Sequence, residues 1–221
     1  MTHPSATNGG VKRLLQGGVA GNALIMLNDR SSTLALLATR RSGKPREMVA
    51  PGPDAATLDA ILAIAARTPD HGKLFPWRMI VVPDDRRNAL GALLLDALAI
   101  EDPDCLAAKR DAAIEFAHQA PALVVLVSAP VVGHKIPLWE QELSSGAVAM
   151  NLLTAIHAMG FVGGWITGWP TYSEIVRSAF CEPGQRIAGF FFLGSAGRPL
   201  EERPRPEMNH IASIWSGAEK G

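Results

Sequence analysis

Three consecutive polar residues, Arg40, Arg41 and Ser42, carry the clearest chemistry in this sequence. Two guanidinium groups and a hydroxyl within one turn can hold a phosphate monoester through paired, charge-assisted hydrogen bonds. The cluster also follows an expected helix, where basic side chains can simply complement the negative end of the helix dipole. Phosphate binding and dipole compensation both stay open for this cluster.

A second candidate segment is Arg67-Thr68-Pro69-Asp70-His71, which is followed closely by Pro76-Trp77. Prolines restrict the backbone, and charged loops that are held rigidly in this way often carry function. Arg67 and His71 can equally be an ordinary surface charge and an ordinary loop histidine. The presence of the arginine cluster in the same chain favours the functional interpretation of this segment.

A third candidate is the glycine-rich segment 160–169, which reads Gly-Phe-Val-Gly-Gly-Trp-Ile-Thr-Gly-Trp. Glycines at 163 and 164 allow backbone amides to approach a planar ligand closely. The segment is not a dinucleotide fingerprint, because it follows a helix and lacks the G-x-G-x-x-G spacing. It indicates either a flat cofactor or a tight structural turn.

The elements that must position these segments are a mixture of helices and strands. Ser31 or Ser32 can cap a first helix that ends at the arginine cluster, and Asp54 can cap a second that stops before Pro69. The apolar run 123–127 predicts a strand buried on both faces. Further helices are expected over 86–100, 101–120, 139–159 and 173–180, and further strands over 78–82, 161–166 and 187–193.

These elements predict one α+β domain with a central mixed or antiparallel sheet flanked by helices. The helix over 139–159 is apolar almost all round, so we expect it to be buried, between subunits if the protein is oligomeric. We divide the chain into a flexible leader, 1–28, a domain, 29–197, and an extended C-terminal arm, 198–221. Apolar residues in that arm predict that it lies against a partner subunit.

Composition narrows the class of protein. The chain has 221 residues, 48% of them hydrophobic, which is enough for one full core. Its 21 basic and 21 acidic residues balance, so we expect no nucleic-acid partner. The two cysteines have no metal-ligand spacing, and we find neither a secretion signal nor a membrane span. We therefore expect a cytoplasmic protein without a bound metal.

The chain contains residue types that hydrolases and metal enzymes use, but not in the motifs of either class. Ser144, Ser145 and His71 are residue types that a hydrolase uses, but residues 193–197 read Leu-Gly-Ser-Ala-Gly and the G-x-S-x-G elbow is missing. A metal enzyme would need histidines and carboxylates at ligand spacing. His71, His134, His157 and Glu140 show neither H-x-x-x-H nor H-E-x-x-H.

The order of five motifs resembles the nitroreductase family, and most closely its short, single-domain bacterial branch. The resemblance covers about residues 32 to 195. The order is more specific than any motif alone, and it reads Arg40-Arg41-Ser42, then Ala66 to His71, then Pro76-Trp77, then Trp139-Glu140-Gln141-Glu142, then Gly163-Gly164-Trp165.

This resemblance implies a nitroreductase-like fold and an intertwined homodimer with an FMN in each of two sites built from both subunits. It also implies an oxidoreductase that passes hydride from NAD(P)H through FMN to an electron-poor acceptor, such as a nitroaromatic or a quinone, with ping-pong kinetics. The chemistry would be carried by FMN and not by a catalytic side chain. A non-catalytic flavin-binding protein, or a family variant performing dehalogenation or flavin cleavage, stays open.

The resemblance also assigns roles to individual positions. Thr167 keeps a hydroxyl where the closest relatives have a serine, but Ile166 stands where they have an arginine, so a charge is absent. Arg198 is a candidate for a C-terminal phosphate ligand. The implied FMN contacts are Arg40, Arg41, Ser42, Lys44, Arg67, His71, Trp165, Ile166 and Thr167, and the implied NAD(P) contacts are Ala155, Ile156, His157, Ala158, Met159 and Gly160.

Overall fold

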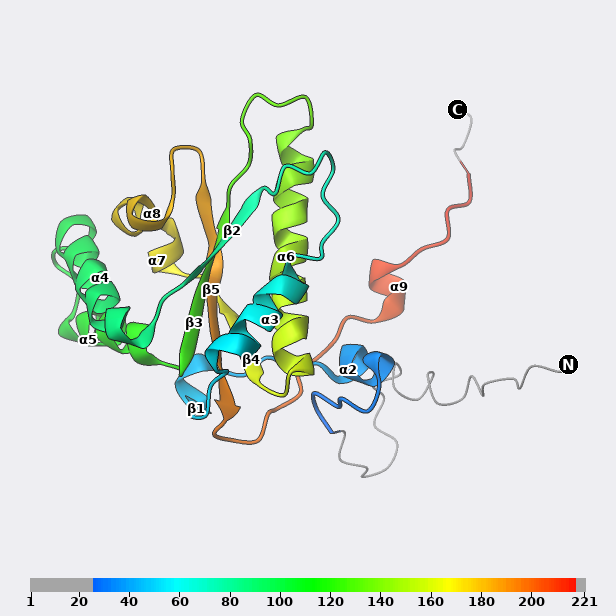
Figure 1. Ribbon diagram of the computed structural model, residues 1–221, viewed down its shortest axis with the longest axis horizontal. Coiled ribbons are helices and arrows are strands. Elements are labelled where there is room, and N and C mark those ends of the chain that lie inside the picture. The colour runs from blue at the N-terminus through cyan, green and yellow to red at the C-terminus, as the bar shows by residue number, and fades with distance from the viewer. Residues whose placement is uncertain (1–25, 218–221) are drawn as a thin grey trace, which may run out of the picture.

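The computed structural model of the protein describes residues 26–217, so most of the expected leader lies outside the described residues. Helices and strands alternate along the chain (Figure 1). The helices are α2 (Thr33–Thr39), α3 (Ala55–Ala65), α4 (Arg87–Glu101), α5 (Ala107–His118), α6 (Leu138–Ala158), α7 (Trp169–Tyr172), α8 (Glu174–Phe180) and α9 (Met208–Ile211), with short 3-10 turns η1 (Pro45–Glu47) and η2 (Asp84–Arg86). The strands are β1 (Met48–Val49), β2 (Trp77–Val81), β3 (Ala122–Ser128), β4 (Val162–Ile166) and β5 (Arg186–Ala196).

The sheet is built around its last strand, β5. Strand β5 pairs antiparallel with β3, β4 and β1, and β2 adds to the outer edge of β3. Each pairing in the described part of the chain is antiparallel, which confirms the expected α+β class and selects the antiparallel form of the sheet.

Both faces of this sheet are buried. Along β5, Phe190 and Phe192 point into one core, while Phe191 and Leu193 point into the other. Since successive side chains of a strand alternate between faces, an uninterrupted apolar run supplies both cores. Helices α4, α5 and α8 cover the first face, and α3 and α6 cover the second (Figure 1).

Two helix starts follow their predicted caps. The Ser32 hydroxyl accepts a hydrogen bond from the amide of Ala35, and the Asp54 carboxylate accepts one from Thr57. Both satisfy an amide that the first helical turn leaves free. Helix α2 ends at Thr39 and α3 at Ala65, which brings the chain out of each helix at the two basic segments singled out above.

Helix α6 is only partly buried within the single chain, and burial of the rest between subunits stays a prediction. Its inner face packs against β3, β4, β5 and α3. Its outer face carries Trp139, Leu143 and Met150, which are 66%, 52% and 40% exposed, and Gly146, where an added Cβ would meet no atom within 4 Å. Steps of four, three and four residues place these positions on one side of the helix, which we call the α6 stripe.

Several elements differ from the sequence-based expectation. Strand β1 and helix α7 were not predicted, and β5 extends to Ala196, three residues beyond its expected end. Strand β1 has two residues, and it exists because they pair with Ser195 and Ala196 at the far end of β5. The polar helix expected over 101–120 begins only at Ala107.

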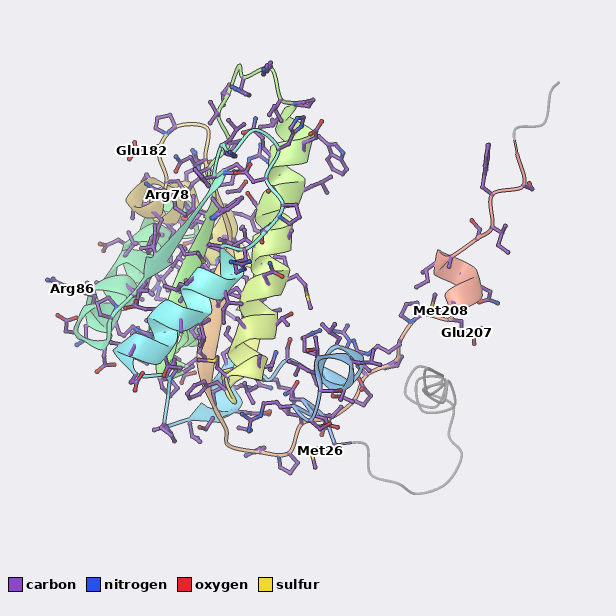
Figure 2. All side chains as sticks on the ribbon, turned by 45° about the vertical axis from the view of Figure 1, so that its right-hand side comes forward. Met26, Arg78, Arg86, Glu182, Glu207 and Met208 are labelled. Atoms are coloured by element: carbon purple, nitrogen blue, oxygen red, sulfur yellow. The ribbon has the colours of Figure 1, made fainter. Side chains whose placement is uncertain are left out.

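The C-terminal arm extends away from the domain (Figure 2). It contains no helix or strand between residues 198 and 207, and then forms the single turn of α9. Met208, Ile211, Ile214 and Trp215 are all largely exposed in the single chain. Within residues 26–217, no helix combines the length and apolar character that crossing a membrane requires.

Candidate functional site

The arginine cluster lies in an extended segment, residues 40–44, which we call the arginine loop. Asn28 braces it: the Asn28 side chain accepts from the amide of Arg41 at 2.7 Å and donates to the carbonyl of Arg41 at 3.1 Å. Within the loop, Nη1 of Arg40 donates to the hydroxyl of Ser42 at 3.1 Å. The predicted cluster is therefore ordered by the chain around it.

A third arginine joins this loop from the C-terminal arm. Arg205 donates to the carbonyl of Arg40 at 3.3 Å and to the carboxylate of Glu202 at 2.9 Å. Burial, and then the positive charges of Arg205 and Arg41, hold the pKa of Arg40 below its ordinary value, while Glu202 opposes this shift. Three guanidinium groups thus face one nearby carboxylate, which leaves an excess of positive charge suited to an anion.

The geometry argues against dipole compensation as the role of these arginines. Arg40 is the C-cap of α2 and has already left the helix, with φ −56° and ψ 126°. Arg41 donates its Nε to the carbonyl of Glu201 at 2.6 Å, and not to a carbonyl of α2. The last turn of α2 contains no basic residue. The phosphate-binding interpretation is the one that these contacts favour.

Strand β4 lies directly against the arginine loop. The amide of Gly43 donates to the carbonyl of Gly163 at 3.2 Å. A Cβ on Gly164 would come within 2.9 Å of the carbonyl oxygen of Gly43, and a Cβ on Gly43 within 2.5 Å of Val162. At Gly164 a Cβ would meet backbone of the loop, and at Gly43 it would meet the side chain of Val162, so both positions favour glycine. The structure therefore brings the first and third candidate segments together.

The side chains that follow the glycines point to opposite faces of the sheet. Trp165 stacks on Phe191, with ring centroids 5.4 Å apart and planes inclined by 22°, and its Nε1 donates to the carbonyl of Ala188. Ile166 packs against the other core, and Thr167 is exposed. Trp165 and Thr167 are accessible to a ligand beside the loop, whereas Ile166 is largely committed to packing.

Gly189 makes the position of Trp165 possible, and this leads to a stability prediction. A Cβ at residue 189 would lie 2.1 Å from Nε1 of Trp165, at the point where the β3–β5 register shifts. Gly189→Val is expected to displace the indole and to lower the free energy of unfolding by about 1–3 kcal/mol through overpacking. Thermal unfolding and tryptophan fluorescence measure the two effects.

Gly91→Ala is the matched control for that substitution. Gly91 lies inside α4, and a Cβ there would make only ordinary contacts at 3.9 Å. Removing a glycine from a helix is expected to keep or slightly raise stability. Equal stability of Gly189→Val and the wild type would contradict the packing described for Trp165.

The second candidate segment forms a loop, residues 67–76, which we call the histidine loop and which is fastened to α6. Asn151 donates to the carbonyl of Arg67 at 3.0 Å and to the hydroxyl of Thr68 at 2.8 Å. Nearer the start of α6, Nδ1 of His71 lies 2.7 Å from Oε2 of Glu140. The row of polar residues along α6 therefore fixes the loop's path.

Two further bonds fasten the histidine loop, and they bear on the hydrolase alternative. The hydroxyl of Ser144 donates to the carbonyl of Pro69 at 2.5 Å, and that of Ser145 donates to the carbonyl of Pro76 at 2.6 Å. Both serines hold backbone and neither is bonded to a histidine, so their contacts do not support a serine nucleophile. In the part of the chain that the structure describes, no group of three or more metal-ligating side chains comes together.

One protomer does not bring the arginine loop and the histidine loop to the same place. The histidine loop runs along α6 from Asn151 to Glu140, near the start of the helix, whereas α2 lies at the C-terminal end of α6 (Figure 1). Glu140 and His157, which mark the two ends, are seventeen residues apart on one helix, or about 25 Å along its axis. The predicted FMN contacts are therefore divided into two groups within the chain.

The segment predicted to contact NAD(P) is divided between the interior and the surface. Ala155, Ile156 and His157 are buried, whereas 158–160 are exposed. His157 also borders a cleft of about 400 Å³ that Arg30 and Arg198 line. Arg198, the C-terminal phosphate ligand suggested by the sequence, lies in this cleft, and it is Arg205 that bonds to the arginine loop.

Three contributors to these loops were not singled out from the sequence. Asn28 and Asn151 are ordinary polar residues whose partners are far away in the chain, and no local pattern marks them. Arg205 could have been noticed, because Pro204 and Pro206 hold it in an extended segment beyond the last strand. The sequence pointed only to Arg198 in that region.

The fold defines the class of protein. The structure is similar to a nitroreductase-like family protein from Bacillus cereus, with a TM-score of 0.73 and 19% identity over 90% of this chain and 100% of that chain. It is also similar to the FMN and NADPH-dependent nitroreductase NfnB from sphigopyxis sp. strain HMH, with a TM-score of 0.64 and 20% identity over 82% and 97% of the two chains. The nitroreductase-like fold is confirmed.

Sequence comparison places the chain within that class. A model described as "Nitroreductase family" matches residues 37–195. "Putative NAD(P)H nitroreductase YdjA" of Escherichia coli (strain K12) is 35% identical over 167 residues, 73% of this chain and 87% of the relative. "Putative NAD(P)H nitroreductase" of Haemophilus influenzae is 35% identical over 175 residues, 78% and 92% of the two chains. The chain belongs to the nitroreductase family, a family of oxidoreductases.

Proposed function

We propose that this protein is an FMN-dependent oxidoreductase that transfers hydride from NAD(P)H to an electron-poor acceptor, such as a nitroaromatic or a quinone, with ping-pong kinetics. The observation that carries the proposal is the arginine loop, with its excess positive charge, hydrogen-bonded to the glycine segment of β4. When bound, FMN would supply the hydride transfer, and the protein's task is to hold and orient it.

The residues of the arginine loop fit the phosphate end of FMN. Arg40 and Arg41 would form charge-assisted hydrogen bonds to the phosphate, and Ser42 would add a hydroxyl donor. Arg205 would add a third cation from the arm, next to the carbonyl of Arg40. Lys44, exposed and paired with Glu47 at 3.3 Å, would lie at the edge of the site.

The glycine segment fits the ring end. Gly164 is buried against Gly43 of the arginine loop, and Trp165 and Thr167, which follow it, have accessible side chains. We assign Ile166 a backbone contact, since its side chain packs in the core. For NAD(P)H we restrict the proposed contacts to the exposed residues Ala158, Met159 and Gly160.

Arg67 and His71 enter the proposal through a second copy of the chain. His71 lies near the start of α6 and the arginine loop lies beyond the end of this helix, so one protomer cannot present both to one cofactor. Arg67 begins the same loop as His71, beside Asn151. The α6 stripe and the exposed apolar residues of the C-terminal arm support a homodimer, in which the histidine loop of one protomer would meet the arginine loop of the other. The domain boundaries 29–197 and 198–221 form part of this proposal.

The first experiment is an absorbance spectrum of the purified full-length protein, followed by anaerobic addition of NADPH and then NADH. We expect oxidised-flavin bands that one or both nucleotides bleach, and extracted flavin that matches FMN. A protein that cannot be reconstituted with FMN would overturn the proposal. A bound flavin that neither nucleotide reduces would point instead to a non-catalytic flavin-binding protein.

Acceptor specificity needs a second measurement after reduction has been shown. Turnover with a nitroaromatic and with a quinone, with product analysis, is expected to show parallel initial-rate lines when NAD(P)H and acceptor are varied together. Release of halide from a halogenated acceptor, or loss of the flavin itself, would identify dehalogenation or flavin cleavage as the reaction.

A further inference from the structure

His157 is a buried histidine that no proposed contact with a ligand explains. It lies in the last turn of α6 and is 1% exposed. Its Nε2 accepts a hydrogen bond from the amide of Gly163 at 3.2 Å, so the ring is neutral and its proton is on Nδ1. Nδ1 is itself buried and has no hydrogen-bond partner of ordinary geometry among the described residues.

Gly163 connects this histidine to the arginine loop. Its amide donates to His157, and its carbonyl accepts from the amide of Gly43 at 3.2 Å. Within the described residues β4 is hydrogen-bonded to β5 on one edge, so the backbone groups of Gly163 on the other edge need partners. His157 and Gly43 satisfy them, and a single residue, Gly163, thereby joins α6, β4 and the loop.

The surroundings of Gly163 leave little room for movement. An added Cβ there would lie 3.1 Å from Ile156 and 3.2 Å from Leu153, and one added to Gly164 would lie 2.9 Å from the carbonyl oxygen of Gly43. A shift of β4 toward or away from α6 must therefore move the arginine loop as well.

Packing alone does not account for a histidine at this position. Burial, and then the charge of Arg40, lower the pKa of His157 to about 4, against a slight opposing effect of the Leu153 carbonyl. An aliphatic residue would fill the same space without an unpaired Nδ1 and without this loss of hydration. What the imidazole provides, and an aliphatic side chain cannot, is an acceptor for the Gly163 amide.

We propose that His157 is a positioning residue for the cofactor: through Gly163 it sets the position of the arginine loop relative to β4, and thus the fit of FMN against both. The inference rests on the proposed function. It gives His157 a role without direct contact, in place of the NAD(P) contact that the family resemblance implied. The buried side chain touches neither FMN nor nucleotide in this role.

The test compares three full-length variants, His157→Leu, His157→Gln and Val148→Ala. Leucine fills the space but cannot accept a hydrogen bond, whereas glutamine can accept one through Oε1. Val148 is fully buried on the same helix, and its truncation weakens the core without removing a hydrogen bond. For each variant we would measure the dissociation constant for FMN, by titrating apoprotein and following flavin fluorescence, and the melting temperature of the apoprotein.

His157→Leu is expected to raise the dissociation constant for FMN about tenfold, because an amide of the site loses its partner. His157→Gln is expected to remain within about threefold of the wild type. Val148→Ala is expected to lower the melting temperature and leave the dissociation constant unchanged. An unchanged constant in His157→Leu, no rescue by glutamine, or the same rise in Val148→Ala would overturn the inference.

A second readout does not depend on FMN. Amide hydrogen exchange of the peptides that contain Gly43 and Gly163 is expected to be faster in His157→Leu apoprotein than in wild type, and unchanged in Val148→Ala. If the wild type fails to bind FMN, the proposed function fails, while this exchange still tests the coupling. Equal exchange at Gly43 in His157→Leu and the wild type would disprove the coupling itself.

Discussion

Arg40→Ala is expected to weaken FMN binding by about 10- to 100-fold, which corresponds to the loss of one or two charge-assisted hydrogen bonds. Arg40 is half-buried, is oriented by Ser42 and carries unneutralised charge beside Arg41 and Arg205. Fluorescence titration of apoprotein with FMN measures the effect. Arg41 and Arg205 remain in the variant, so binding should be weakened and not abolished.

Two controls make this prediction specific to the phosphate. Riboflavin has the same ring but no phosphate, so wild type and Arg40→Ala are expected to bind it with similar, weak affinity. Arg86→Ala removes an exposed arginine on the opposite side of the protein from α2 and is expected to bind FMN normally (Figure 2). If Arg40→Ala weakened riboflavin as much as FMN, the arginine would not be acting on the phosphate.

Leu143→Glu is expected to convert the proposed dimer to a monomer and to remove most of the flavin that we propose it binds. Leu143 lies in the middle of the α6 stripe and is half exposed in a single protomer, so the carboxylate should leave the protomer folded. In a twofold-symmetric interface the substitution occurs twice, and each copy would bury an unpaired charge. Light scattering after size-exclusion chromatography gives the mass, and absorbance gives the flavin content.

The matched control places the same substitution on the other side of the sheet. Ile114 on α5 is 44% exposed and belongs to the layer of helices that covers the opposite face. Ile114→Glu is expected to stay dimeric and yellow. A monomeric Leu143→Glu that kept wild-type affinity for FMN would contradict the division of the site between two protomers.

Local signals predicted the elements that position the arginine loop. The caps Ser32 and Asp54 could be read directly, because a short polar side chain before an apolar helix satisfies a free amide. The central strand β3 could also be read, because a strand buried on both faces is apolar at consecutive positions. These signals lie within a few neighbouring residues.

The rest depends on partners that are distant in the chain. Strand β1 exists only through its pairing with the end of β5, and Arg205 becomes part of the arginine loop only because the arm returns past Arg40. The same holds for the exposed stripe of α6, whose apolar composition resembles that of a fully buried helix. The split of the candidate site between the two ends of α6 could not be read from motif order at all.

The central place of β5 also has a consequence for how the protein acquires its structure during synthesis. Strand β5 pairs with β1, β3 and β4, yet it is the last strand to leave the ribosome. Until β5 emerges, only the β2–β3 pair of the sheet can form. The apolar faces of β3, α4 and α6 then lack the strand against which they pack in the folded domain. The core of the nascent domain therefore cannot close until late in translation. The arginine loop is synthesised early, but its partners Gly163 and Arg205 are synthesised much later.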